Sequence, residues 1–250
     1  MSAALPSPQG HLTAPEFRRL DSGKILETAR ALTARVGERF PDSGLRRMSA
    51  ELVGVGQDIG RQSLWLGRPV WPIRALSILT GFAMVALAIG IVLAVLYRPS
   101  ALYQSKSELV QALDAVVNLI VLLGAALWFL VSWEQRFKRG RALGSLHVLR
   151  SMAHIIDMHQ LTKDPERILE SGPATATAPV ERMTASQLTW YLDYCSELLS
   201  MLSKLAALLV QEFDDREALE SVNDVETLCA GLSRKIWQKI GLVDTRSSNV

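Results

Sequence analysis

Apolar residues follow two patterns along the chain, one continuous and one periodic. Two runs carry no charged side chain: residues 75–97 (ALSILTGFAMVALAIGIVLAVLY) and residues 115–133 (AVVNLIVLLGAALWFLVSW). About 20 consecutive apolar residues allow a helix to cross the hydrocarbon core of a bilayer. A buried helix of a soluble protein is the alternative for either run alone. Because aromatic and charged residues flank both runs, the pattern predicts two transmembrane helices.

Outside these runs, apolar residues recur every three or four positions, which is the spacing of amphipathic helices. Two such helices precede the first run. One has Ile25, Ala29, Leu32 and Val36 on one face and ends at Phe40–Pro41, and the next carries Leu45, Met48, Leu52, Val55 and Ile59. Asp42 or Ser43 is available as the N-cap of the second helix. No strand pattern of any strength occurs.

The strongest periodicity lies near the C-terminus and predicts a helical hairpin. Its first apolar stripe runs from Leu188 to Phe213 and is too wide for one neighbour, and its second runs from Val222 to Ile240. We place the turn at residues 214–216 with Asp214 as the cap of the second helix, and Gly241 as its C-cap. This register brings Cys195 against Trp237. It keeps Cys195 and Cys229 too far apart for a disulfide, so both are expected to be buried, reduced thiols.

The second run is expected to belong to a long helix. Ser105 and Glu108 have the spacing of a capping box, so this helix should begin near Lys106 and continue to about Leu161, with Gly140 or Gly144 as bending points. The fold expected is all-α, a two-span transmembrane helical hairpin with cytoplasmic helices packed as a bundle. Its segments are a disordered N-terminus (1–15), cytoplasmic amphipathic helices (16–68), transmembrane helix 1 (73–97), a short outer loop (98–112), transmembrane helix 2 (113–133), a cytoplasmic extension (134–163), a linker (164–183), the C-terminal hairpin (184–241) and a tail (242–250).

Basic residues predict the orientation of the hairpin. Eight lie beside the outer flanks of the two runs (Arg61, Arg68, Arg74, Arg136, Lys138, Arg139, Arg141, Arg150), and two lie between the runs (Arg98 and Lys106). Basic flanks stay in the cytoplasm, so both termini are expected there. The first twenty residues have no apolar core of the length that a signal peptide needs. The layout resembles that of many bacterial membrane effectors and scaffolds, which favours the plasma membrane, most simply the bacterial inner membrane.

Charge is unevenly distributed along the chain. Residues 164–250 contain 14 acidic and 8 basic side chains, whereas residues 1–163 contain 11 acidic and 19 basic ones. A basic band beside the spans suits anionic lipid headgroups, with candidate contacts at Arg68, Arg74, Arg136, Lys138, Arg139 and Arg141. The acidic C-terminal region is either a solvated helix surface or a docking element for a basic partner, including the chain's own N-terminal region.

Three of the four histidines lie in residues 146–160 (LHVLRSMAHIIDMHQ). This stretch is the one in the chain that most suggests a metal-binding or catalytic site. His147 and His154 are about 20° apart around a helix, with Arg150 and Asp157 near the same stripe, and His159 points about 140° away from His154. The two histidines are roughly 10.5 Å apart along the axis, too far for one metal ion. We therefore expect a polar or pH-sensitive face and no metal or other cofactor.

Packing inside the membrane is expected to use small and polar residues. Ala86, Gly90 and Ala94 form a small-residue ridge on the first span, and Asn118 is the one strongly polar side chain of the second. Such residues favour close helix contact and hydrogen bonds between helices. Neither charge-free run contains an ionisable residue, which argues against a proton or ion relay.

Sequence motifs of enzymes are absent. The segment GVGQDIGR (54–61) is rich in glycine but follows a helix rather than a strand, so it does not predict a phosphate-binding loop. Basic residues are not interleaved with aromatics as a nucleic-acid surface requires. The leading hypothesis is an integral membrane helical interaction module, a scaffold or signalling adaptor without catalytic activity. Its expected partners are membrane lipids and, through the C-terminal hairpin, a second copy or another helical protein. The alternatives are an oligomeric pore gated by its cytoplasmic helices, and a metal-binding or enzymatic protein that uses the histidine-rich helix.

Overall fold

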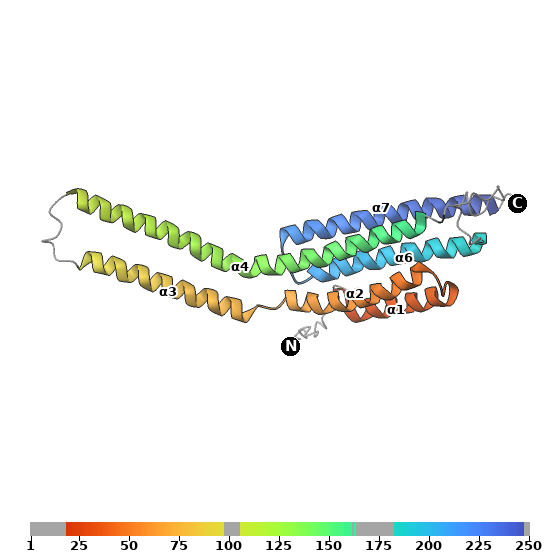
Figure 1. Cartoon of the computed structure of the whole chain (residues 1–250), viewed down its shortest axis with the longest axis horizontal. Coiled ribbons are helices and arrows are strands. Elements are labelled where there is room, and N and C mark those ends of the chain that lie inside the picture. The colour runs from red at the N-terminus through yellow and green to blue at the C-terminus, as the bar shows by residue number, and fades with distance from the viewer. Residues whose placement is uncertain (1–18, 98–105, 162, 164–182, 248–250) are drawn as a thin grey trace, which may run out of the picture. The chain divides into compact units, whose positions relative to one another are not determined.

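The computed structural model describes residues 19–97, 106–161, 163 and 183–247, and every regular element in these residues is a helix. The all-α prediction is therefore confirmed for the described part of the chain. Contacts divide the chain into a bundle unit (residues 1–64 and 145–250) and an apolar unit (residues 65–144). The helices are α1 (Ser22–Arg39), α2 (Gly44–Leu66), α3 (Trp71–Leu96), α4 (Lys106–Leu161), α6 (Ala185–Val210) and α7 (Arg216–Ser247), as labelled in Figure 1.

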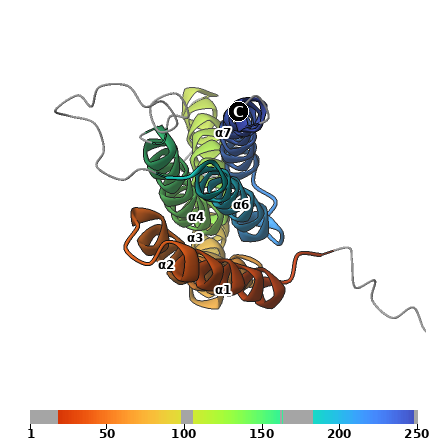
Figure 2. The same ribbon diagram turned by 90° about the vertical axis from the view of Figure 1, so that its right-hand side faces the viewer.

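Helix α6 forms the centre of the bundle unit. It lies between the α1–α2 pair on one side and α4 and α7 on the other (Figure 2). Of its 26 residues, 14 are buried, including Tyr191, Cys195 and Leu202. Its wide apolar stripe thus contacts several neighbours at once, as the sequence predicts. The predicted face of α1 is also confirmed, because Ile25, Ala29, Leu32 and Val36 are its buried residues.

Side-chain caps and prolines set the ends of the bundle helices. Asp21 accepts hydrogen bonds from the N–H groups of Gly23 and Lys24 at the start of α1, and α1 ends before Phe40–Pro41 because the residue preceding proline disfavours helical geometry. Ser43, one of the two predicted caps, accepts from the Arg46 N–H at 3.2 Å where α2 begins. A reciprocal pair of bonds between Thr184 and Gln187 starts α6.

The C-terminal hairpin forms as predicted but differs in three details. Asp215, not Asp214, caps α7, because its carboxylate accepts from the Ala218 N–H at 3.1 Å. Gly241 does not end the helix: α7 runs to Ser247, since buried Val243 extends the apolar stripe by another turn. Trp237 is 59% exposed, so its predicted packing against Cys195 in the seam is wrong. Both thiols are free and buried, as expected.

The apolar unit contains α3 and the N-terminal part of α4. Two helices of the chain are long and apolar enough to cross a membrane, and only 6% of each apolar window is buried within the chain. A core helix of a soluble protein would bury most of that window. Leu79 and Phe82 on α3 are 68% and 72% exposed. These exposures support a membrane location for the two helices.

Contacts between α3 and α4 differ from the expected ones. Helices α3 and α4 pack closely at Gly81, because a Cβ there would lie 3.0 Å from the Leu127 side chain. Ser77 donates a hydrogen bond to the Leu130 carbonyl at 3.2 Å. The predicted ridge does not fill this role: Ala86 and Gly90 are exposed, and the side chain of Ala94 lies outside the described set. Helix α4 begins at Lys106, so residues 106–112 of the expected outer loop are helical.

Candidate functional site

The predicted histidine face is a solvent-exposed surface of α4. His147, Arg150 and His154 are exposed, and Asp157 is half-buried. Arg150 pairs with Asp224 of α7 at 3.1 Å, whereas Asp157 accepts a hydrogen bond from the Gln160 side chain at 2.6 Å. The two charged residues therefore have different partners, and the structure does not join the four residues into one site.

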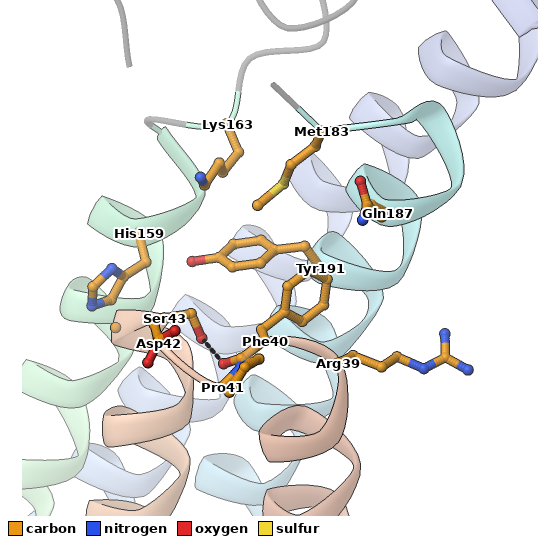
Figure 3. Close-up of a pocket in the computed structure, with 11 residues that line it drawn as sticks. Arg39, Phe40, Pro41, Asp42, Ser43, His159, Lys163, Met183, Gln187 and Tyr191 are labelled. Atoms are coloured by element: carbon orange, nitrogen blue, oxygen red, sulfur yellow. Dashed lines mark hydrogen bonds between the residues drawn. The ribbon is translucent and has the colours of Figure 1, made fainter. Parts of the chain in front are cut away.

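The third histidine of the cluster, His159, lies in a cleft at the end of the bundle where α4 terminates (Figure 3). The cleft has a volume of about 410 Å³, within the usual range of small-ligand sites. Its walls come from the α1–α2 turn, the end of α4 and the start of α6. The lining residues are Arg39, Phe40, Pro41, Asp42, Ser43, Gly44, His159, Lys163, Met183, Gln187 and Tyr191.

Aromatic packing fixes the floor of the cleft. Phe40 is buried at the end of α1 and meets the Tyr191 ring of α6 edge to face, with 5.4 Å between the ring centres. The Lys163 ammonium lies 5.5 Å from the centre of the same tyrosine ring, and in Figure 3 it points into the cleft. The Arg39 guanidinium lies 3.9 Å from the centre of the Trp190 ring. In Figure 3 the Arg39 side chain points away from the cleft. Of the two basic residues Arg39 and Lys163, Lys163 is therefore the one whose charged group points into the cleft.

His159 packs directly on the first residue of α2. A Cβ added at Gly44 would come within 2.3 Å of the imidazole Cε1, so only glycine leaves space for the ring there. Burial lowers the pKa of His159, and the charges of Arg47 and Lys163 lower it further. The imidazole is thus predominantly neutral at pH 7, and one ring nitrogen can accept a hydrogen bond.

The cleft combines one cation, a neutral imidazole, a tyrosine hydroxyl, an amide and the carboxylate of Asp42. These groups can hold a small polar ligand. Sequence reasoning missed His159 as a site residue because it compared the histidines only with one another. The sequence features that belong to this cleft are His159 and Gly44, two residues that the fold brings into contact. Within the described residues, no three His, Cys, Asp or Glu side chains are placed to hold a metal ion.

A second polar cluster lies in the apolar unit, one residue beyond the second charge-free run. Glu134 of α4 is 7% exposed. Its carboxylate accepts from the Arg74 guanidinium at 2.6 Å and from the Val70 N–H at 3.1 Å. It also pairs with the Lys138 ammonium at 2.9 Å, which in turn donates to the Arg68 carbonyl at 2.7 Å. We call Glu134, Arg74 and Lys138 the ionic latch, because they join α4 to the segment between α2 and α3.

Hydrogen bonds keep the Glu134 carboxylate ionised. Burial raises the pKa of the Glu134 carboxyl, but hydrogen bonds from Arg74, Lys138 and Val70 outweigh this effect and bring the pKa to about 2. Lys138 is 7% exposed. Its predicted role in lipid contact is therefore revised, because its ammonium is enclosed between Glu134 and a backbone carbonyl. The sequence signal for the latch was the single acidic residue among the basic ones that follow the second run.

The other basic residues predicted to contact lipid differ in their environment. Arg68, Arg136 and Arg141 are exposed, and Arg139 is half-exposed. Arg74 keeps a 55% exposed side chain although it binds Glu134. Four arginines of the predicted band therefore lie at the surface outside the latch.

Polar packing inside the hairpin is also different from the prediction. Asn118 is exposed, and its amide donates to Asp114 one turn earlier on α4, at 3.4 Å. The amide thus bonds within its own helix and not to α3. No family model, curated protein or solved structure matches the chain.

Proposed function

We propose that the chain is an integral membrane protein whose apolar unit anchors a helical interaction module. The observation that carries the proposal is the exposure of large apolar side chains on α3 and α4. Among the described residues, ten on α3 and its C-cap, and seven between Val117 and Trp133, are 38–83% exposed. At about 1 kcal/mol for each partly exposed side chain, leaving them in water costs roughly 15 kcal/mol. That is as large as the folding free energy of a typical domain, which supports a lipid environment around them.

The proposed topology places both termini in the cytoplasm of the plasma membrane, of the bacterial inner-membrane type. Its support is the excess of basic residues on the outer flanks of the hairpin. Cysteine labelling in intact cells tests it. An Asn223→Cys variant in exposed α7 should resist an impermeant thiol reagent, while Ser105→Cys between the two runs should react. The natural cysteines are buried and give little background. Labelling at position 223 from outside would refute this topology.

The interaction surface proposed is the end of the bundle at which α4 terminates. The polar cleft opens there, and Lys239 of α7 donates to the Gln160 carbonyl at 3.1 Å, which brings the C-terminal parts of α4 and α7 together. Four large apolar side chains at this end are exposed: Met158 by 65%, Leu161 by 60%, Trp237 by 59% and Leu242 by 53%. Apolar and aromatic side chains beside polar groups are typical of protein interfaces.

Site-specific photocrosslinking in intact membranes tests this surface. A photoreactive residue at Met158 should give defined crosslinked products that mass spectrometry identifies as one partner, either a helical protein or a second copy. Leu219, at the opposite end of α7 and 44% exposed, is the matched control position. Equal products at both positions, or none at Met158, would contradict the proposed interaction surface.

A second candidate function is an oligomeric, pore-like assembly, and one feature of α4 favours it. Gln111, Asp114 and Asn118 are all exposed and recur at the spacing of a single helix face. A polar side chain that faces lipid is costly, and assembly of several copies would turn this face toward a shared axis. Conductance of the purified protein in liposomes separates the two candidates, since an anchored module without a pore carries no current.

A further inference from the structure

The strongest unexplained feature is the charge at the latch end of the apolar unit. Segments 67–74 and 134–141 contain six basic residues and one acidic residue, Glu134. That one carboxylate is buried and bound to Arg74 and Lys138. The latch therefore uses the only negative charge of these two segments internally. The surface around it carries arginines that this carboxylate does not neutralise.

Two of these arginines are held on aromatic rings. The Arg136 guanidinium carbon lies 5.1 Å from the centre of the Phe129 ring and 6.0 Å from that of Trp128. The Arg141 carbon lies 5.1 Å from the centre of the Trp65 ring and 5.7 Å from that of Phe137. In the described part of the apolar unit, no ion pair joins either guanidinium to a carboxylate. Contact with the rings restricts each guanidinium and leaves its N–H groups available for an acceptor that offers two oxygens, such as a phosphate.

Arg136 lies at the depth of the headgroup layer of a bilayer, and Arg141 lies about 4 Å beyond that layer with its guanidinium beside the Phe137 ring, one turn nearer the apolar run. Arg136 follows the end of the second charge-free run by three residues and Arg141 by eight. At 1.5 Å per helical residue these positions are roughly 4.5 and 12 Å beyond the apolar run. The headgroup region extends about 5–8 Å beyond the hydrocarbon core on each side. Aromatic side chains are enriched at the interface between membrane and water. The two rings beside Arg136 lie near that end of the apolar run and are exposed, Trp128 by 69% and Phe129 by 43%.

We propose that Arg136 and Arg141 bind the phosphate groups of anionic phospholipids and give the protein a preference for them over zwitterionic lipids. The proposal rests on the proposed membrane insertion and adds the lipid class and the residues that select it. A zwitterionic headgroup offers the same phosphate but also carries a cation. The surplus of arginines repels that cation and so disfavours binding of the zwitterionic lipid. A basic residue near an anionic surface contributes about a fivefold factor in binding, so the two together contribute about 30-fold.

Competition between two lipids tests the proposal on the full chain. The protein is reconstituted into vesicles made from equal amounts of phosphatidylcholine and phosphatidylglycerol, extracted in mild detergent, and analysed by native mass spectrometry. Wild-type protein should retain phosphatidylglycerol preferentially. The Arg136→Gln/Arg141→Gln variant should lose this preference by up to about 30-fold. The charge-matched control, Arg30→Gln/Arg234→Gln, removes two exposed arginines of the bundle unit and should behave as wild type.

The outcomes separate this proposal from the membrane insertion on which it rests. Removal of the wild-type protein from vesicles by alkaline carbonate would refute insertion itself. Insertion with equal retention of both lipids, or a variant as selective as wild type, would refute the lipid proposal alone. If the double variant misfolds, wild-type protein gives the answer, because its preference must fall as ionic strength rises from about 0.1 to about 1 M.

Discussion

Replacement of Glu134 by glutamine should open the base of the hairpin. The pKa of this carboxyl falls from 4.5 to about 2 in the folded protein, which corresponds to about 3 kcal/mol of stabilisation at neutral pH. The same change leaves the Lys138 ammonium, with its side chain only 8% exposed, without a counter-charge. Removing one partner of a buried pair costs about 3–5 kcal/mol, so both arguments give a loss of about 3 kcal/mol.

Hydrogen exchange measured by mass spectrometry is the suitable assay, because it reports local opening. The Val70 N–H donates to Glu134, and its exchange in Glu134→Gln should accelerate about 100-fold at pH 7. Glu134→Gln/Lys138→Met removes both charges and should recover at least half of this loss of protection. Asp58→Asn, which breaks a pair whose side chains are 80% and 70% exposed, should change protection of its own helix by less than about twofold.

The pH dependence of the latch follows from the direction of the pKa shift. Because the folded pKa of Glu134 lies below the unfolded value, the stabilisation is complete above about pH 5 and is lost as pH falls from about 4.5 toward 2. Unchanged exchange at Val70 in Glu134→Gln would refute the reasoning. So would a double variant less protected than the single one, since the enclosed ammonium would then not be the source of the cost.

Three further results are expected in the bundle unit. His159 should titrate below 6.5 in an NMR pH series; since its folded pKa is lowered, bundle stability should fall as pH drops below 6.5 in wild type and less in His159→Gln. Gly44→Ala should displace the His159 ring and destabilise the bundle by about 1–2 kcal/mol, whereas Gly54→Ala, with open space around it, should stabilise by up to about 1 kcal/mol in thermal unfolding. Burial raises the pKa of Cys195 to about 12 and that of Cys229 to about 11, so both thiols should resist alkylation at pH 8 until the protein is denatured.

Patterns of local spacing were enough to predict most of the helices. The face of α1, the break before Pro41 and the start of α4 near Lys106 all follow from apolar periodicity and helix-breaking residues. The sequence left open whether α4 continues without a break to Leu161, and the structure shows that it does. These features depend on residues within one or two turns of each other. Helix ends were less predictable: Asp214 and Asp215 are equally good caps in sequence, and the choice depends on how buried Phe213 and Ala218 close the turn.

Both polar sites were invisible to the same reasoning because each joins distant segments. Glu134 and Arg74 are 60 positions apart, and the latch forms only when α3 and α4 pack as a hairpin. His159 meets Gly44 across two different helices. A helical wheel of α4 alone shows His147 and His154 aligned and directs attention away from His159.

The division of the bundle unit imposes an order on biosynthesis. Its first part, residues 1–64, is separated from α6 and α7 by the whole apolar unit. Between the synthesis of Leu66 at the end of α2 and Val210 at the end of α6, translation at about 5–20 residues per second takes roughly 7–30 s. During that time Leu32, Leu52 and Ile59, which are almost fully buried in the finished bundle, have no α6 to cover them. The nascent chain therefore carries an exposed apolar surface while its hairpin is being delivered to the membrane, and it needs a holding chaperone or the membrane surface itself until α6 emerges.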